Sequence, residues 1–312
     1  MPTGIVLSPR YRDHLTGPGH PERPDRVVAI ESRLSADGLL DELVRIEPRP
    51  ATEADVLRCH AAEYVAAARR DVAAGKESLS TGDTPISPGS FDTALLAAGG
   101  VLAAVDGVFA GRVANAFAVV RPPGHHATPT KGMGFCLFNN VAIAARYAQA
   151  VHGAERVMIA DWDVHHGNGT QDIFYADASV FFFDTHQHPL YPGTGSAAET
   201  GTGPGRGFTK NCPFPAGAGR TEIVGAFAEL LVPAAAAFRP DLLLVSAGFD
   251  SRIDDPLGSF RLTDDDFAEL TGIVRDIAAR HCNGRLVSTL EGGYAIEGLA
   301  SAAAAHVRAL LD

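Results

Sequence analysis

The chain has little cysteine and no clustered positive charge. Its four cysteines are widely spaced and form no CxxC pair, which argues against a disulfide framework or a zinc ribbon and predicts buried thiols. Lys and Arg number 26 against 37 Asp and Glu, for a formal net charge of -11. Because nucleic-acid phosphates require a basic face, we expect no nucleic-acid partner.

The sequence pattern also predicts no long hydrophobic runs. Residues 1–13 contain no signal-type apolar segment, and we identify no run long enough to cross a bilayer. We therefore expect no membrane partner and a cytoplasmic location. Glycine (33) and proline (20) are abundant instead, which indicates many structured loops of the kind that carry binding and catalytic residues.

Short apolar runs alternate with helical periodicity along the whole chain. This alternation predicts an α/β fold with a mainly parallel sheet that is covered on both faces. No repeat or linker divides the chain, so we expect one domain over residues 1–312. The expected strands lie at 4–7, 43–46, 116–120, 157–165, 180–183, 208–211, 242–245 and 285–290. The expected helices lie at 26–34, 52–59, 61–74, 91–109, 139–152, 222–238, 262–280 and from about 297.

Four polar clusters follow the ends of predicted strands. They are RPPGHH (121–126), DWDVHH (161–166), SAGFD (246–250) and EGGY (291–294). In open parallel sheets, ligands bind outside the carboxyl ends of the strands. The four clusters therefore predict a single site along one rim of the sheet.

The stretch VMIADWDVHHGNGT (157–170) is the richest of these clusters. Read as a strand that ends in a Gly-Asn-Gly turn, it places Asp161, Asp163 and His165 on one side. Asp163 and His165, completed by Asp250 from a neighbouring strand end, suit Zn²⁺, while Fe²⁺, Co²⁺ and Mn²⁺ stay open. Alternatively, Asp163 caps a turn and His165 is a core histidine. The adjacent histidine pair at 125–126 favours the metal.

Several motifs together resemble the zinc-dependent histone deacetylase superfamily, most closely its class II and bacterial amidohydrolase branch. The resemblance covers nearly the whole chain, from about residue 14 to residue 294, and implies an arginase-like α/β/α fold with an eight-stranded, mainly parallel sheet. The motifs are RPPGHHA (121–127), GFCLFNN (134–140), DWDVHHGNGTQ (161–171), SAGFD (246–250) with DDPLG (254–258), and EGGY (291–294).

The resemblance also implies a division of catalytic labour. Asp163, His165 and Asp250 would hold one Zn²⁺, which polarises an amide carbonyl and lowers the pKa of a water molecule. In this family pattern, His126 takes the proton of that water and later protonates the leaving amine, and the neighbouring His125 supports the same transition state.

Three further residues complete the implied catalytic set. Tyr294 donates its hydroxyl to the developing oxyanion. Asp161 pairs with His125, and Asn168 pairs with His126 at a position where class I enzymes carry Asp. From the residues alone, the histidine pair is equally compatible with a polar loop that binds phosphate or packs its own turn, and Tyr294 with a buried tyrosine in a glycine-made turn.

The same resemblance implies a substrate channel. Phe135, with the adjacent Gly134, and Tyr191 would flank an alkyl chain, and Asp83 would accept hydrogen bonds at the rim. Polyamine-specific relatives carry an acidic gatekeeper where this chain has Leu257. We therefore expect an acylated lysine peptide or a small acylated amine as the substrate. Alternatively, Phe135 is a core residue, Tyr191 a loop aromatic and Asp83 a turn former.

A structural K⁺ often accompanies the catalytic metal in this family. Main-chain oxygens around Asp161, Asp163 and His165, together with Asp184 and Thr185 on the next strand, would hold it. Alternatively, Asp184 merely ends its strand.

Three other functions stay open at this point. An acetylpolyamine amidohydrolase is the nearest, since acidic selectors can lie elsewhere. An arginase-type ureohydrolase needs two Mn²⁺ ions and a further Asp-x-Asp pair, which SAGFDSRIDD does not supply at the required place. A non-catalytic protein that binds acylated ligands is the third. The oligomeric state stays open as well.

Overall fold

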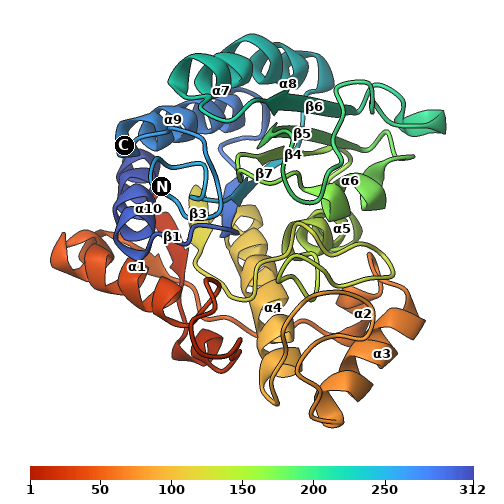
Figure 1. The fold of residues 1–312 in the computed structure, drawn as a ribbon. Helices are drawn as coiled ribbons and strands as arrows, with labels where there is room; N and C mark the ends of the chain where they lie inside the picture. Colours follow the sequence, from red (N-terminus) through yellow and green to blue (C-terminus); the bar gives the residue numbers. More distant parts are fainter.

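An eight-stranded, all-parallel sheet forms the centre of the computed structural model, which describes residues 1–312 (Figure 1). The strand order is β2-β1-β3-β8-β7-β4-β5-β6, and the predicted fold class is confirmed. The strands are β1 (Thr3–Val6), β2 (Val44–Arg45), β3 (Asn115–Ala118), β4 (Val157–Asp161), β5 (Val180–Gln187), β6 (Thr209–Phe214), β7 (Leu242–Ala247) and β8 (Leu286–Leu290).

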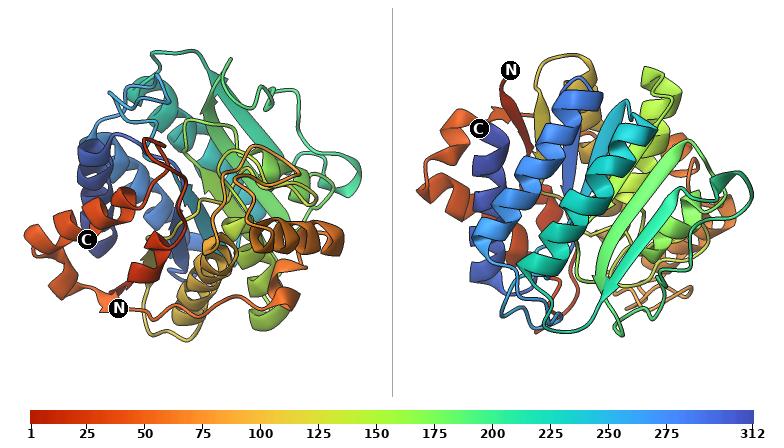
Figure 2. Two further views of the ribbon diagram at one scale, coloured as in Figure 1. Left: turned by 60° about the horizontal axis from the view of Figure 1, so that its bottom comes forward. Right: turned by 90° about the horizontal axis from the view of Figure 1, so that it is seen from above.

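Helices cover both faces of the sheet (Figures 1 and 2). One layer packs α1 against α10, α10 against α9, and α9 against α7 and α8, while the other packs α4 against α3 and α5. The α-helices are α1 (Asp25–Ala36), α2 (Glu53–Val56), α3 (Ala62–Ala73), α4 (Ser90–Phe109), α5 (Asn140–His152), α6 (Asn168–Phe174), α7 (Arg220–Ala226), α8 (Val232–Phe238), α9 (Asp264–His281) and α10 (Ile296–Leu311). The short turns are η1 (Pro9–Arg12), η2 (Leu39–Glu42), η3 (Gly203–Gly205) and the π-helical turn η4 (Phe227–Leu231).

The central strands are continuous apolar runs because helices bury both of their sides. Every residue of β7 and β8 is buried. Capping side chains set where the flanking helices begin: Thr52 and Asp55 form a capping box at α2, and Thr263 and Asp266 form one at α9. This scaffold holds the carboxyl ends of β3, β8, β7 and β4 side by side.

The predicted strand through His165 was wrong beyond Asp161, where β4 ends. The backbone leaves the sheet because side-chain carboxylates replace the neighbouring strand as hydrogen-bond acceptors. The amide of Asp163 donates to Asp161 Oδ1 (3.0 Å), that of His165 to Asp163 Oδ1 (2.9 Å), and that of Val164 to Asp250 Oδ1 (2.9 Å). The Gly-Asn-Gly segment likewise starts α6 at Asn168, not a loop.

Two helices are long and apolar enough to cross a membrane by length and composition, so the expectation that no run reaches that length was wrong. The first, α4, is 83% buried within the fold and is a core helix. The second spans Arg220–Phe238 and is only 39% buried. Core helices of soluble proteins pass the same test, so this finding is weak support for a membrane segment.

Candidate active site

Asp163, His165 and Asp250 converge in the segments that follow β4 and β7. One ligand atom from each lies within 4.8 Å of the others, and all three residues are buried. His165 Nδ1 lies 3.0 Å from Asp163 Oδ1 and 3.2 Å from Asp250 Oδ2, and the latter oxygen has no hydrogen bond of acceptable geometry. The backbone that follows the neighbouring strand β8 approaches closely at Gly292, where a Cβ would stand 1.9 Å from Asp250 Oδ2.

The charges of this group are unbalanced. Burial and the neighbouring Asp163 charge raise the pKa of Asp250 to about 7. Burial opposes protonation of His165, yet the nearby carboxylates of Asp163 and Asp250 outweigh burial and raise the pKa of His165 to about 10. Two buried carboxylates around one imidazole, with one oxygen unsatisfied, form a donor set that fits a divalent cation. The structure therefore supports a metal at the predicted place.

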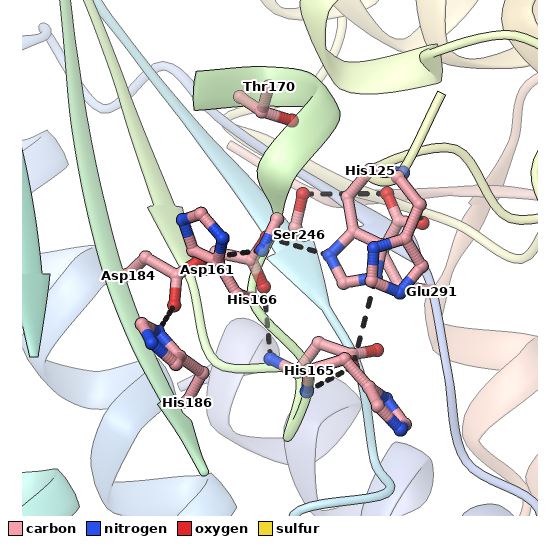
Figure 3. Close-up of polar contacts among 12 residues, drawn as sticks. His125, Asp161, His165, His166, Thr170, Asp184, His186, Ser246 and Glu291 are labelled. Carbon is pink, nitrogen blue, oxygen red and sulfur yellow. Dashed lines mark hydrogen bonds and ion pairs between the residues drawn. The ribbon is translucent and has the colours of Figure 1, made fainter. Parts of the chain in front are cut away.

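The ring of His125 contacts the carboxylate of Asp161 (Figure 3). Its Nδ1 lies 3.0 Å from Asp161 Oδ2, and its backbone amide donates to Glu291 Oε2 at 3.1 Å. Burial lowers the pKa of His125, but Asp163 and Asp161 outweigh burial and raise the pKa well above its usual value. The structure thus brings together Asp161 and His125, as expected, and adds Glu291 as the group that orients the backbone of this loop.

The ring of His126 contacts the side-chain amide of Asn168. Its Nδ1 lies 2.8 Å from Asn168 Oδ1, in the first turn of α6. Burial and the adjacent charge of His125, whose ring centroid is 4.0 Å away, hold the pKa of His126 well below its usual value. Because a carbonyl oxygen only accepts hydrogen bonds, this pairing assigns the proton to Nδ1 and leaves Nε2 with a free lone pair.

A cavity of about 300 Å³ opens beside His126 and His165. All five residues expected to contact substrate line it, together with His126, His165 and Tyr294. Leu190, which the sequence analysis did not identify, lines it as well. The five are Asp83, Gly134, Phe135, Tyr191 and Leu257.

Contacts across its mouth hold the walls in place. Asp83 accepts hydrogen bonds from the Gly134 amide at 2.9 Å and from Tyr191 Oη at 3.3 Å. Gly134 adopts φ +55°, and a Cβ there would meet the His126 ring at 2.3 Å, so glycine is required for this close approach. Phe135 faces Tyr294 edge-on, with centroids 6.0 Å apart.

The backbone and the ring of Tyr294 are contacted by groups that the sequence analysis did not identify. Its amide donates to Asp255 Oδ2 at 2.7 Å, and the Arg26 guanidinium lies 5.0 Å from its ring centroid. Arg26 Nε also donates to the Gly293 carbonyl at 2.7 Å. The buried carboxylate of Glu22 bridges Arg26 to Arg121. The signal was present as a density of charge in HPERPDR (20–26).

Of the residues expected around K⁺, Asp161, Asp184 and Thr185 lie on the neighbouring strands β4 and β5, where Asp161 pairs with Asp184, and Asp163 and His165 lie in the segment after β4. Thr185 Oγ1 contacts the Asp161 carbonyl at 3.4 Å, and Asp184 Oδ2 accepts the Gly167 amide at 2.8 Å. Asp184 does not end its strand, because β5 continues to Gln187. The ion itself stays a prediction.

Known proteins similar to this chain match it over nearly its whole length. The histone deacetylase domain family matches residues 20–310. A probable deacetylase of Archaeoglobus fulgidus is 44% identical over 300 residues, which cover 96% of this chain and 83% of the relative. A histone deacetylase-like amidohydrolase of Pseudomonas aeruginosa is 44% identical over 277 residues, covering 88% and 73%. The human polyamine deacetylase HDAC10 is 42% identical over 301 residues, covering 93% of this chain and 44% of that protein. The crystal structure of the HDA15 HD domain superposes with a TM-score of 0.94 at 38% identity, covering 99% of this chain and 89% of that one.

Proposed function

This chain belongs to the histone deacetylase family, a family of hydrolases, and from that membership we propose that it is a zinc-dependent amidohydrolase that removes an acyl group from an amine. The observation that carries the proposal is that His126, Tyr294 and the metal-ligand residue His165 line one cavity, with Asp163 and Asp250 beside His165 and His125 beside His126. We further propose that residues 1–312 act as one catalytic domain, located in the cytoplasm, with a structural K⁺ near Asp161.

Asp163, His165 and Asp250 would hold the zinc. A Zn²⁺ ion bound there supplies Lewis-acid chemistry, since it polarises an amide carbonyl and lowers the pKa of water. One ligand atom of each residue already lies within 4.8 Å of the others, which supports their binding of a single ion.

The two histidines divide the proton chemistry. Neutral His126 accepts the proton of the attacking water at Nε2, and then delivers it to the nitrogen of the departing amine. The charges of Asp163 and Asp161 favour the protonated form of His125, so its positive charge would stabilise the negative charge that develops on the carbonyl oxygen. Asn168 holds the His126 ring in place without adding a charge.

Tyr294 completes the site from the other side. Its hydroxyl forms no hydrogen bond within the protein and its side chain lines the cavity with His126 and His165. Burial raises the pKa of Tyr294 well above its usual value, so the hydroxyl keeps its proton and can donate it to an oxyanion. One donor of this kind is worth about 3 kcal/mol of transition-state stabilisation.

The walls of the cavity favour an uncharged alkyl chain. Phe135, Leu190, Tyr191 and Leu257 line it, and Asp83 at the rim is the only acidic residue among the lining groups. We infer that the substrate is an acylated lysine peptide or a small acylated amine. An acetylpolyamine is the alternative, supported by the name of the human relative.

A turnover panel tests the proposal. Acetyl-lysine peptides, longer acyl-lysines and acetylpolyamines are offered to purified protein, which should lose activity with a chelator and recover it with Zn²⁺. Tyr294→Phe should lower kcat by about a hundredfold with unchanged zinc content. Hydrolysis that survives the chelator overturns the mechanism. Bound zinc without turnover of any substrate supports a non-catalytic binder of acylated ligands.

A further inference from the structure

The buried carboxylate of Asp255 lies between two segments that both reach the substrate cavity. Asp255 is only 7% exposed and belongs to the loop that follows the metal-ligand residue Asp250. Leu257, from the same loop, and Tyr294, from the segment after β8, both line the cavity. The side chain of Asp255 is therefore placed to fix one lining segment relative to the other.

Three backbone amides donate hydrogen bonds to this carboxylate. Oδ1 accepts from the Leu257 amide at 2.9 Å, and Oδ2 accepts from the amides of Tyr294 at 2.7 Å and Ala295 at 3.1 Å. A buried carboxylate needs such donors, because a charge without partners in the protein interior is costly. Through these bonds, Asp255 holds the backbone of Tyr294 beside the cavity wall at Leu257.

The backbone that carries Tyr294 belongs to neither a strand nor a helix. It lies between the end of β8 and the start of α10 at Ile296, and the first amides of a helix have no partner within that helix. Side-chain carboxylates accept from these amides instead. The Gly292 amide donates to Asp163 Oδ2 at 2.8 Å, and the Tyr294 amide donates to Asp255. The position of Tyr294 thus depends on a distant side chain.

The hydroxyl of Tyr294 depends on this contact more than its backbone does. It forms no hydrogen bond within the protein, so no polar partner fixes the far end of the side chain in the cavity. A small rotation of the backbone is magnified at the hydroxyl. A displacement of about 1 Å in a group that acts on the reaction can cost about a hundredfold in rate.

We propose that Asp255 is a positioning residue that places the Tyr294 hydroxyl to donate to the oxyanion. This role rests on the proposed function, because it acts through the contact of Tyr294 with the reacting carbonyl. Alternatively, Asp255 only caps α10, whose N-cap residue Ala295 has no side chain that accepts a hydrogen bond. A cap changes stability, whereas a positioning residue changes turnover only while the Tyr294 hydroxyl is present.

A double-mutant cycle of Asp255→Asn and Tyr294→Phe tests this role in the zinc-loaded full chain. The asparagine NH2 group cannot accept, so at least one of the three amides loses its acceptor whichever way the side chain turns. With the best substrate of the turnover panel, Asp255→Asn should lower kcat by about tenfold or more. KM should change by less than about threefold, because the oxyanion develops only in the transition state. In the Tyr294→Phe background, the same substitution should lower kcat by less than about twofold, because no hydroxyl is left to misplace.

Asp266→Asn is the matched control, because Asp266 is another buried carboxylate at the start of a helix. It accepts from the Thr263 amide at 2.8 Å and from the Thr263 hydroxyl at 2.9 Å, and it does not line the cavity. This variant should lower the midpoint of thermal unfolding and leave kcat unchanged.

Fluorine NMR of zinc-free protein labelled with 3-fluorotyrosine adds a readout that does not require turnover. The signal that is missing from Tyr294→Phe belongs to Tyr294. Asp255→Asn should shift this signal, and Asp266→Asn should leave it in place. If Asp255→Asn does not fold, Asp255→Ser, which leaves room for water to accept from the amides, takes its place in both experiments.

The outcomes separate this role from the proposed function. A parent without turnover overturns the proposed function, and the role of Asp255 with it. An active parent in which Asp255→Asn lowers kcat equally in both backgrounds overturns the positioning role alone, in favour of a helix cap. A Tyr294 signal that Asp255→Asn leaves unmoved overturns it as well.

Discussion

His306 should make the stability of this protein depend on pH in the range where histidine titrates. The side chain is fully buried in α10, its ring packed edge-on against Phe117, Trp162 and Phe249. Its Nδ1 lies 2.7 Å from Thr271 Oγ1, and its Nε2 lies 2.8 Å from Ser288 Oγ.

These contacts suit the neutral ring. Thr271 donates its own proton to the Phe267 carbonyl at 2.6 Å, so its oxygen is free to accept from His306 Nδ1, while Ser288 donates to Nε2. Burial without a nearby carboxylate lowers the pKa of His306 to about 3. The unfolded chain binds a proton near pH 6.5, and the folded chain does not.

The direction and size of the pH effect on stability follow from this difference in pKa between the folded and the unfolded chain. Above about pH 6.5 the ring is neutral in both the folded and the unfolded state, so His306 adds no pH dependence. Below that pH, each unit of pH lowers the free energy of unfolding by about 1.4 kcal/mol. At about pH 5 the loss amounts to roughly 2 kcal/mol, and it keeps growing until the folded-state pKa is reached.

Urea unfolding at pH values between about 5 and 7 measures this loss. His306→Gln keeps a hydrogen-bonding side chain without the titration, so its free energy of unfolding should fall with acid by roughly 2 kcal/mol less than that of the parent. His188→Gln, at an exposed histidine, is the matched control and should follow the parent. Parallel curves for the parent and His306→Gln would refute the reasoning.

Three other substitutions probe the site and its support. Asp250→Asn should lower zinc affinity by at least about a hundredfold, and one zinc retained per chain after dialysis would contradict the ligand assignment. Leu257→Glu should shift the kcat/KM ratio about tenfold toward acetylpolyamines over acetyl-lysine peptides, whereas the neutral control Leu257→Gln should not; equal ratios for the two variants would show that charge at this position does not select the substrate. Glu22→Gln should cost about 3 to 5 kcal/mol in the free energy of unfolding, because it leaves the buried guanidinium groups of Arg26 and Arg121 without a charge partner, and a loss below about 1 kcal/mol in denaturant titrations would contradict that pairing.

Local sequence was sufficient for the two central strands β7 and β8, because parallel strands buried on both faces must be apolar throughout. The runs at 242–245 and 285–290 needed no other information, and each lies within one or two residues of β7 and β8. The rule that ligands gather at the carboxyl ends of such strands then placed His125, Asp163 and Asp250 together before any distance was known.

Features that depend on distant partners could not be predicted in this way. The end of β4 at Asp161 depends on carboxylates that capture backbone amides, among them Asp250, which lies 86 residues from the amide of Val164. Glu22 is similarly 99 residues from Arg121 in sequence, and its burial makes sense only once the two guanidinium groups surround it. Charged residues in a loop predict exposure by default, so these residues gave no local sign of burial.

The unequal partners of the two histidines follow from how many negative charges the site can hold. Asp161, Asp163 and Glu291 are fully or almost fully buried around His125, and Asp250 is buried beside Asp163, so in the proposed mechanism a divalent cation and one protonated imidazole would offset most of the negative charge. A further carboxylate beneath His126 would favour a second protonated ring, and a protonated His126 has no lone pair at Nε2 with which to accept a proton. An amide at position 168 holds the ring by the same hydrogen bond without that charge. In the proposed mechanism one imidazole thus carries charge and the other transfers the proton, and the two partners that set this difference, Asp161 and Asn168, both belong to the single segment that runs from β4 into α6.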